Sequence, residues 1–269
     1  IDVSFYQGEI DWQAVADSGV EFAMIRVGYR GYSQGALQMD ERFRENMDGA
    51  LAAGLDVGVY FFSQATSVLE AEEEADFVLS AIRGYPIKYP VAFDWEFIDG
   101  AEARTNGMDG DTVTQCATAF CDLISVAGYT PMVYFNQELG YLFYQLDQLD
   151  ASQFWLAEYD TKPDFFYDFE MWQYTSSGRV AGISGDVDLN LRFFRDGSKD
   201  DLTEVWKDPD GREDPQEEIQ EVPQEEQEDS GKDSNLPRTS PSKGEQSANK
   251  MRSRSCGTAF LHKKWAIFL

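Results

Sequence analysis

Short apolar runs alternate with longer amphipathic stretches over the first 150 residues of the chain. The apolar runs are rich in β-branched and aromatic residues and predict strands at 1–4, 22–29, 57–63, 91–97 and 132–136. The stretches between them carry the apolar repeat of helices, at 12–18, 40–53, 68–82, 111–127 and 138–146. Four of these helices are followed by glycines suited to left-handed backbone, namely Gly19, Gly54, Gly84 and Gly128. Strict alternation of strand and helix predicts a parallel sheet.

The alternation of predicted strands and helices ends after residue 150. Three more strand-like runs follow at 154–159, 170–175 and 187–193, with no helical repeat between them. Five strand–helix units and three further strands make eight strands, the number that closes a small barrel around a side-chain-filled interior. We therefore predict an α/β fold, an irregular TIM-like (β/α)5β3 barrel over residues 1–197, with an open doubly wound sheet as the alternative.

The strand at 91–97 carries two acidic side chains on one face. Its bulky apolar residues share the other face, so Asp94 and Glu96 are expected to point into the barrel while the apolar face packs under the helices. They stand at the carboxyl end of the strand, where such barrels place their sites. Two further acids, Asp2 and Asp188, are predicted to point inward at the same mouth.

Any acid–base chemistry in this domain has to proceed without imidazole, because the only histidine of the chain is His262. Two carboxylates spaced i and i+2 on a strand lie roughly 6–7 Å apart at Cα and flank one scissile bond, as glycoside hydrolysis requires. Repulsion in a shared pocket separates their pKa values, so that one stays protonated near neutral pH. Helix capping or loop salt bridges, and a Ca²⁺ or Mg²⁺ site, are the alternatives. Four inward acids favour catalysis, since burying them without a use would be costly.

The acidity of the chain lies mainly in its first part. Residues 1–197 hold 33 acidic and 11 basic side chains, so we predict no nucleic acid partner and attribute the charge chiefly to solubility. No apolar run of about 18 residues is present, which predicts no membrane span. The chain starts at Ile1 with no charged and apolar leader.

Composition shifts again after residue 197. Residues 198–250 are rich in Asp, Glu, Gln, Pro and Ser and are predicted to form a disordered linker, because they bury too little apolar surface to offset ordering entropy. Residues 251–269 are basic and then apolar, and their role stays open. Cys116 and Cys121 lie five apart in a helical pattern, beyond disulfide reach, so we expect two reduced, partly buried thiols.

Five blocks of sequence, in the same order, carry a family resemblance. Residues 2–12 (Asp-Val-Ser…Gln-Gly…Ile-Asp-Trp) and residues 90–96, with their Asp-x-Glu, resemble glycoside hydrolase family 25, the Chalaropsis-type lysozymes. Residues 155–159, 172–174 and 187–190 are similar to later blocks of that family. The resemblance implies an N-acetylmuramidase that cuts the β-1,4 bond between N-acetylmuramic acid and N-acetylglucosamine in peptidoglycan, on an irregular barrel with five helices.

The resemblance also implies roles for the acids. Glu96 would be the proton donor and Asp94 its partner carboxylate, either as nucleophile or as the group that orients the substrate's acetamido group. Asp2 and Asp188 would complete the acidic floor. The expected outcome at the sugar is retention, and neither a metal nor a cofactor is expected.

Aromatic side chains near the strand ends are candidates for sugar binding, because their faces stack on the apolar face of a pyranose. The predicted substrate-binding set is Tyr60, Phe62, Tyr134, Tyr159, Trp172, Gln173 and Asn190. Phe61-Phe62 departs from the polar-containing triplet associated with this family after the strand at 57–63. Arg26 points inward by alternation, and we expect it to pair with the acidic floor.

Two other function classes stay open. One is a cell-wall-binding module without turnover, against which the four acids argue; the other is another carboxylate-dependent barrel glycosidase of the chitinase type. The longer Asp-x-x-Asp-x-Asp-x-Glu pattern of the chitinases is absent before Glu96. The expected partner is the glycan strand of bacterial peptidoglycan, the expected place of action is outside the cell or at its wall, and a monomer is the default state.

Overall fold

Eight strands close into a barrel in the part of the chain that the structure describes. This computed structural model describes residues 1–98, 102–149, 152–159 and 162–194. The barrel strands are β1 (Asp2–Val3), β2 (Phe22–Arg30), β4 (Asp56–Ser63), β5 (Val91–Trp95), β6 (Pro131–Asn136), β7 (Gln153–Ala157), β8 (Met171–Gly178) and β9 (Val187–Arg192). They pair in the order in which they are named, and β9 pairs back with β1. Closure confirms the predicted barrel, and the open doubly wound sheet is wrong.

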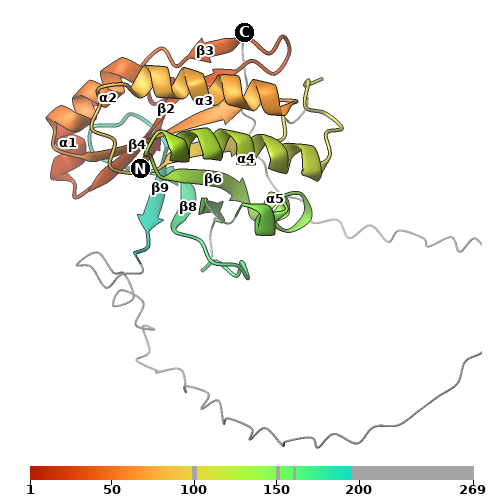
Figure 1. The fold of residues 1–269 in the computed structure, drawn as a ribbon. Helices are drawn as coiled ribbons and strands as arrows, with labels where there is room; N and C mark the ends of the chain where they lie inside the picture. Colours follow the sequence, from red (N-terminus) through yellow and green to blue (C-terminus); the bar gives the residue numbers. More distant parts are fainter. Residues whose placement is uncertain (99–101, 150–151, 160–161, 195–269) are drawn as a thin grey trace, which may run out of the picture. The chain divides into compact units, whose positions relative to one another are not determined.

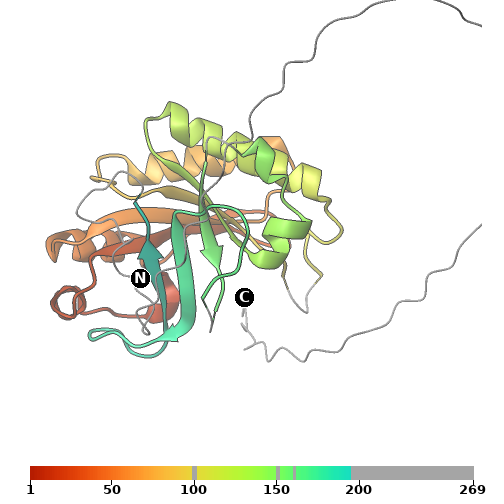
Figure 2. The ribbon, with the colours of Figure 1, turned by 90° about the horizontal axis from the view of Figure 1, so that it is seen from below.

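Strand direction changes only at the end of the barrel. Neighbours from β1 through β8 run parallel, whereas β9 is antiparallel to both β8 and β1. In both ribbon views the β8–β9 pair lies opposite the side covered by helices α3 and α4 (Figures 1 and 2). Because the first strands are parallel, their carboxyl ends all meet at one mouth of the barrel.

Helices cover the outside of the strands. They are α1 (Trp12–Asp17), α2 (Phe43–Ala52), α3 (Val68–Ile82), α4 (Gly110–Val126) and α5 (Gln137–Leu142), with short 3₁₀ turns η1 (Phe5–Gln7) and η2 (Leu146–Gln148). Helices α3 and α4 lie side by side across the outer face (Figure 1). Side-chain caps begin four of the α-helices, provided by Asp11, Ser67, Asp109 and Asn136. The four predicted glycines all have positive φ, between 85° and 93°.

Two separate apolar cores confirm the predicted alternation along the strands. The larger one joins outward side chains such as Val59 and Phe93 to the helices. The smaller one fills the barrel interior and includes Met24, Ala92 and Met132. Space is short inside: a Cβ on the inward Gly58 would lie 2.6 Å from the Met24 sulfur and 2.7 Å from a backbone oxygen. A glycine is therefore needed at that point of β4.

Several elements differ from the sequence prediction. A short strand, β3 (Leu37–Met39), was not predicted and pairs antiparallel with the end of β2. Helix α2 begins at Phe43 and not at residue 40, because Asp40 is buried and binds Arg26 instead of joining the helix. Strand β5 ends at Trp95, so Glu96 lies just beyond the strand.

The other expectations from composition have mixed outcomes. Cys116 and Cys121 are free and buried, as predicted, and burial raises the pKa of each thiol to about 12. The linker at 198–250 and the tail at 251–269 lie outside the described residues. Among the described residues, no helix combines the length and the apolar character that crossing a membrane would require.

Candidate active site

Asp94 and Glu96 stand at the carboxyl end of β5. Asp94 is the inward residue after Ala92 and is only 5% exposed. Its neighbours across the sheet are Phe62 on β4 and Tyr134 on β6, the residues paired with it at Cα. Glu96 follows the strand and is half-buried. Asp94 therefore sits at the barrel mouth between two aromatic side chains.

Asp2 and Asp188 join this pair through closure of the barrel. Asp2 on β1 is paired at Cα with Met24 on β2 and with Asp188 on β9. Asp2 is 5% exposed, and Asp188 is half-buried. Asp2 interacts electrostatically with Asp94, and Asp188 with Glu96. The structure thus brings together the four acids singled out from the sequence.

The environment raises the pKa of three of the four acids, Asp2, Asp94 and Asp188. Burial, followed by the charges of Glu96 and Asp2, raises the pKa of Asp94 well above its usual range. Burial and the charge of Asp2 raise the pKa of Asp188 to about 8. Burial also raises the pKa of Asp2, although hydrogen bonds from neighbouring amides oppose the shift. These shifts favour the protonated forms of the buried carboxyls, the state that a general acid needs.

Gln173 holds Asp2 in place. Its Nε2 donates to Asp2 Oδ2 at 2.9 Å, and its Oε1 accepts hydrogen bonds from the hydroxyls of Tyr134 at 3.0 Å and Tyr159 at 2.6 Å. Asn190 Nδ2 also donates to Asp2 Oδ2, at 2.8 Å, and Asn190 Oδ1 accepts from the indole N–H of a tryptophan on β7. The polar groups of Gln173 and Asn190 are thus engaged by protein partners around Asp2.

The aromatic candidates are divided between the two sides of the barrel wall. Tyr60 and Tyr134 point inward and meet the edge of Trp155, with ring centroids 6.1 and 5.0 Å away. Burial keeps both phenols neutral by raising their pKa. Tyr159 is 41% exposed beside Gln173. Trp172 precedes the inward Gln173 on β8 and so faces the other side of the strand, where its indole N–H donates to a backbone oxygen.

Arg26 does not pair with the acidic floor as expected. Its Nε and Nη2 both lie within 2.9 Å of Asp40 Oδ2, and the guanidinium is covered by the rings of Phe5, Tyr6 and Tyr29. The pairing was missed because Asp40 was assigned to a helix. Arg26 still acts at a distance, since its charge opposes the rise in the pKa of Asp94.

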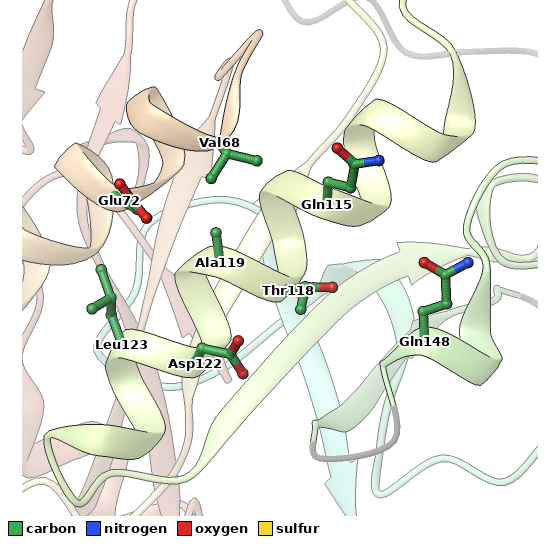
Figure 3. A pocket seen from close by; sticks show the side chains of 8 residues that line it. All are labelled: Val68, Glu72, Gln115, Thr118, Ala119, Asp122, Leu123 and Gln148. Carbon is green, nitrogen blue, oxygen red and sulfur yellow. The ribbon is translucent and has the colours of Figure 1, made fainter.

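A hollow of about 450 Å³ lies elsewhere, on the outer face of the helix layer (Figure 3). It is lined by Val68 and Glu72 of α3, by residues of α4 including Asp122 and Leu123, and by Gln148 of η2. None of the four acids of the barrel mouth lines it. Among the described residues, no group of three or more His, Cys, Asp or Glu side chains is placed to hold a metal ion.

An eight-stranded α/β barrel with a cluster of carboxylates at one mouth defines the class: barrel glycoside hydrolases. The chain belongs to glycosyl hydrolases family 25, whose family model matches residues 1–183.

Relatives and solved structures agree with this assignment. The chain is 30% identical over 195 residues to an autolytic lysozyme of Clostridium acetobutylicum, covering 71% of this chain and 54% of that one. A bacterial lysozyme structure from Streptomyces coelicolor has 28% identity and a TM-score of 0.60, covering 71% and 90% of the two chains. The autolysin LytC of Streptococcus pneumoniae, solved with a synthetic peptidoglycan ligand, has 28% identity and a TM-score of 0.59, covering 71% and 45%. The chain thus spans about half the length of the Clostridium lysozyme.

Proposed function

We propose that this protein is a lysozyme, a 1,4-β-N-acetylmuramidase that hydrolyses the bond between N-acetylmuramic acid and N-acetylglucosamine in bacterial peptidoglycan. The observation that carries the proposal is the pairing of buried Asp94 with half-buried Glu96 at the barrel mouth. Membership of family 25 and the lysozymes among its relatives support it. The catalytic domain is assigned to residues 1–197.

Glu96 is the proposed general acid. The Asp94–Glu96 pair retains a proton near neutral pH, because burial and neighbouring charges disfavour double ionisation. The charge of Arg26 opposes the rise in the pKa of Asp94, and we assign the proton of the pair to Glu96 at the moment of bond cleavage. Glu96 then protonates the glycosidic oxygen, the bond from that oxygen to the anomeric carbon breaks, and the anomeric carbon acquires positive charge.

Asp94 stabilises this charge, either by attacking the anomeric carbon or by orienting the substrate's own acetamido oxygen to do so. Water then completes the reaction while Glu96 takes up its proton, and the configuration is retained. One oxygen of Asp94, Oδ1, is buried without a hydrogen-bond partner in the protein. Such an atom is suited to an acetamido N–H, since unmet buried acceptors are costly.

The remaining acids and the inward aromatics shape the floor for the sugar. Asp2 and Asp188 are proposed to complete the acidic floor, with Gln173 and Asn190 orienting Asp2. Phe62 and Tyr134 flank Asp94 and, with Tyr60 and Tyr159, form the proposed sugar-contacting set. Trp172 is left out of this set, because its side chain lies on the opposite face of β8 from Gln173.

The proposed substrate sets the place of action. Peptidoglycan lies outside the bacterial membrane, so the protein is proposed to act outside the cell or at the wall, as a monomer. Size-exclusion chromatography with light scattering tests the monomer, and a dimer mass would contradict it.

Clearing of purified bacterial walls tests the function. The wild-type protein is expected to lower turbidity, Glu96→Gln to lose at least about 100-fold in rate, and the matched surface variant Glu72→Gln to behave as wild type. Borohydride reduction and mass spectrometry of the fragments should show reduced muramic acid. Reduced glucosamine would overturn the bond assignment. Binding without clearing by the wild type would favour a cell-wall-binding module.

A further inference from the structure

Gln64 lies directly after β4, next to the end of the strand that carries the acids. Its side chain is fully buried, with 0% exposure. The last paired residues of β4 and β5 are Ser63 and Trp95. Gln64 and Glu96 are therefore the residues that follow the last paired position of each strand.

The side-chain amide of Gln64 bridges the ends of β4 and β5. Its Nε2 donates to the backbone oxygen of Glu96 at 3.1 Å and to that of Ser63 at 2.9 Å. Its Oε1 accepts a hydrogen bond from Thr105 Oγ1 at 2.7 Å. Because the two backbone oxygens can only accept, they fix which end of the amide faces Glu96.

The hydroxyl partner Thr105 is itself held firmly. It is 2% exposed and comes from the segment that follows Glu96 in the chain. The preceding Arg104 donates to the backbone oxygen of Gln64 at 3.3 Å and pairs with Glu70 at 2.6 Å. Glu70 in turn accepts from the backbone N–H of Thr66 at 2.8 Å. The two loops that flank Glu96 are thus tied to each other and to the first turn of α3.

The opposite side of the Glu96 segment is packed by aromatic rings. Trp95 stacks on Phe143 with centroids 5.5 Å apart, and Phe97 meets both rings at 5.2 and 5.1 Å. These contacts hold the residues before and after Glu96. The Gln64 amide contacts the Glu96 peptide itself, through its backbone oxygen.

We propose that Gln64, supported by Thr105, is a positioning residue that fixes the backbone of Glu96 so that its carboxyl meets the glycosidic oxygen. The proposal rests on the proposed function, in which Glu96 is the acid. Precise placement matters, because an error of about 1 Å in a reacting group can cost about 100-fold in rate. Such support matters for Glu96 because it lies just beyond the end of β5.

Two substitutions remove the hydrogen bonds while keeping side-chain volume: Gln64→Met and Thr105→Val. We expect kcat on soluble peptidoglycan fragments to fall at least about tenfold for Gln64→Met and about threefold for Thr105→Val, with KM changed less than about twofold. The basic limb of the pH profile of kcat should move to lower pH, because a less firmly held, more hydrated acid ionises more readily. Thr105→Ser, which keeps the hydroxyl, should restore both values.

Thr114→Val is the matched control. Thr114 is equally buried, and its hydroxyl donates to a backbone oxygen at 2.7 Å and accepts from the backbone N–H of Gln145 at 3.0 Å, but it lies in α4 away from the acids. Its loss should change stability without moving the pH profile. Wild-type kcat and an unmoved basic limb in both Gln64→Met and Thr105→Val would overturn the proposal, as would losses equal to those of Thr114→Val at the same folded fraction.

A crystal structure of Gln64→Met gives a readout that does not depend on turnover. The Glu96 peptide should be displaced or less ordered than in the wild-type crystal, and an unchanged Glu96 would contradict the positioning role. If the wild-type reaction produced no muramic acid ends, the proposed function would be wrong. The crystal comparison would still test separately whether Gln64 positions Glu96.

Discussion

Asp2 lies directly opposite Asp188 in the antiparallel pair of β1 and β9 that closes the barrel. Burial and the charge of Asp2 raise the pKa of Asp188 to about 8, and burial raises the pKa of Asp2 as well. Two carboxyls, from the first and the last strand of the barrel, therefore lie side by side with raised pKa values. This arrangement costs stability whenever both are forced to ionise.

The first prediction concerns stability against pH. In the unfolded chain Asp188 loses its proton near its usual pKa of 3.8, whereas in the folded protein it keeps the proton up to about 8. The folded state thus binds more protons over this window, and stability falls as pH rises from about 4 to about 8. Asp188→Asn should remove much of this fall and raise the melting temperature at pH 8.5 by about 4 °C or more.

Thermal unfolding at pH 5 and pH 8.5 measures the effect. Asp122→Asn, on the exposed outer face of α4, is the matched control and should follow the wild type at both values. If the Asp188→Asn and wild-type melting curves stay parallel across this range, Asp188 is ionised already at low pH and the prediction is wrong.

The second prediction concerns the partner carboxylate. Asp94→Asn keeps the shape of the side chain but removes the negative charge that stabilises the anomeric centre. We expect kcat to fall at least about 100-fold and KM to change less than about threefold, because the lost interaction is made in the transition state. Steady-state kinetics on soluble fragments measures both. A rise in KM at constant kcat would assign Asp94 to binding only.

The third prediction concerns the clamp on Asp2. Gln173→Leu removes one donor to Asp2 and the acceptor shared by Tyr134 and Tyr159. Because buried polar groups lose their partners, we expect the free energy of unfolding to drop by about 1–3 kcal/mol in urea denaturation. Tyr159→Phe, which removes one hydroxyl at a partly exposed position, should cost less than about 1 kcal/mol. Equal losses in the two variants would show that Gln173 contributes no more than one of its partners.

The fourth prediction concerns the buried ion pair of Arg26 and Asp40. Asp40 is fully buried at its side chain and accepts from Arg26, from Phe5 N and from Arg42 N. Asp40→Asn leaves the guanidinium without its counter-charge, and we expect a loss of about 3–5 kcal/mol in the free energy of unfolding.

The exposed pair of Lys88 and Asp56 provides the comparison for this variant. Its side chains are 66% and 40% exposed, so Asp56→Asn should change stability by less than about 1 kcal/mol. Urea denaturation of the two variants side by side measures the difference. A cost at Asp40 as small as that at Asp56 would mean that water or another acid near Asp94 takes over the charge of Arg26.

Local sequence patterns predicted the individual strands and helices. The alternation of apolar and acidic side chains around Asp94 predicted which face of β5 points inward. Gly84 predicted the end of α3. The same approach failed where a residue leaves its local pattern for a distant partner. Asp40 looked like the start of a helix, but pairing with Arg26 holds it outside the helix.

The residues of the site also divide into those that local sequence patterns predict and those that only distant contacts reveal. The four acids that the structure brings to one mouth were singled out from the sequence, because inward carboxylates near strand ends are unusual enough to notice. Gln64 was missed, since a lone glutamine after a strand carries no local signal. Trp172 was predicted to bind sugar as an aromatic residue near a strand end. In the structure it is paired with the outward Leu156, so it lies on the outer face of β8.

By itself, the sequence determined the order of strands and helices, the inward direction of Asp94, and the family to which the chain belongs. These are properties of neighbouring residues, set by backbone periodicity and by motif order. Only the tertiary structure decided that Asp2 faces Asp188, that Arg26 binds Asp40, and that Gln64 holds the peptide of Glu96. Those relationships depend on strand register and on barrel closure, which bring together residues whose separation along the chain says nothing about their distance in space.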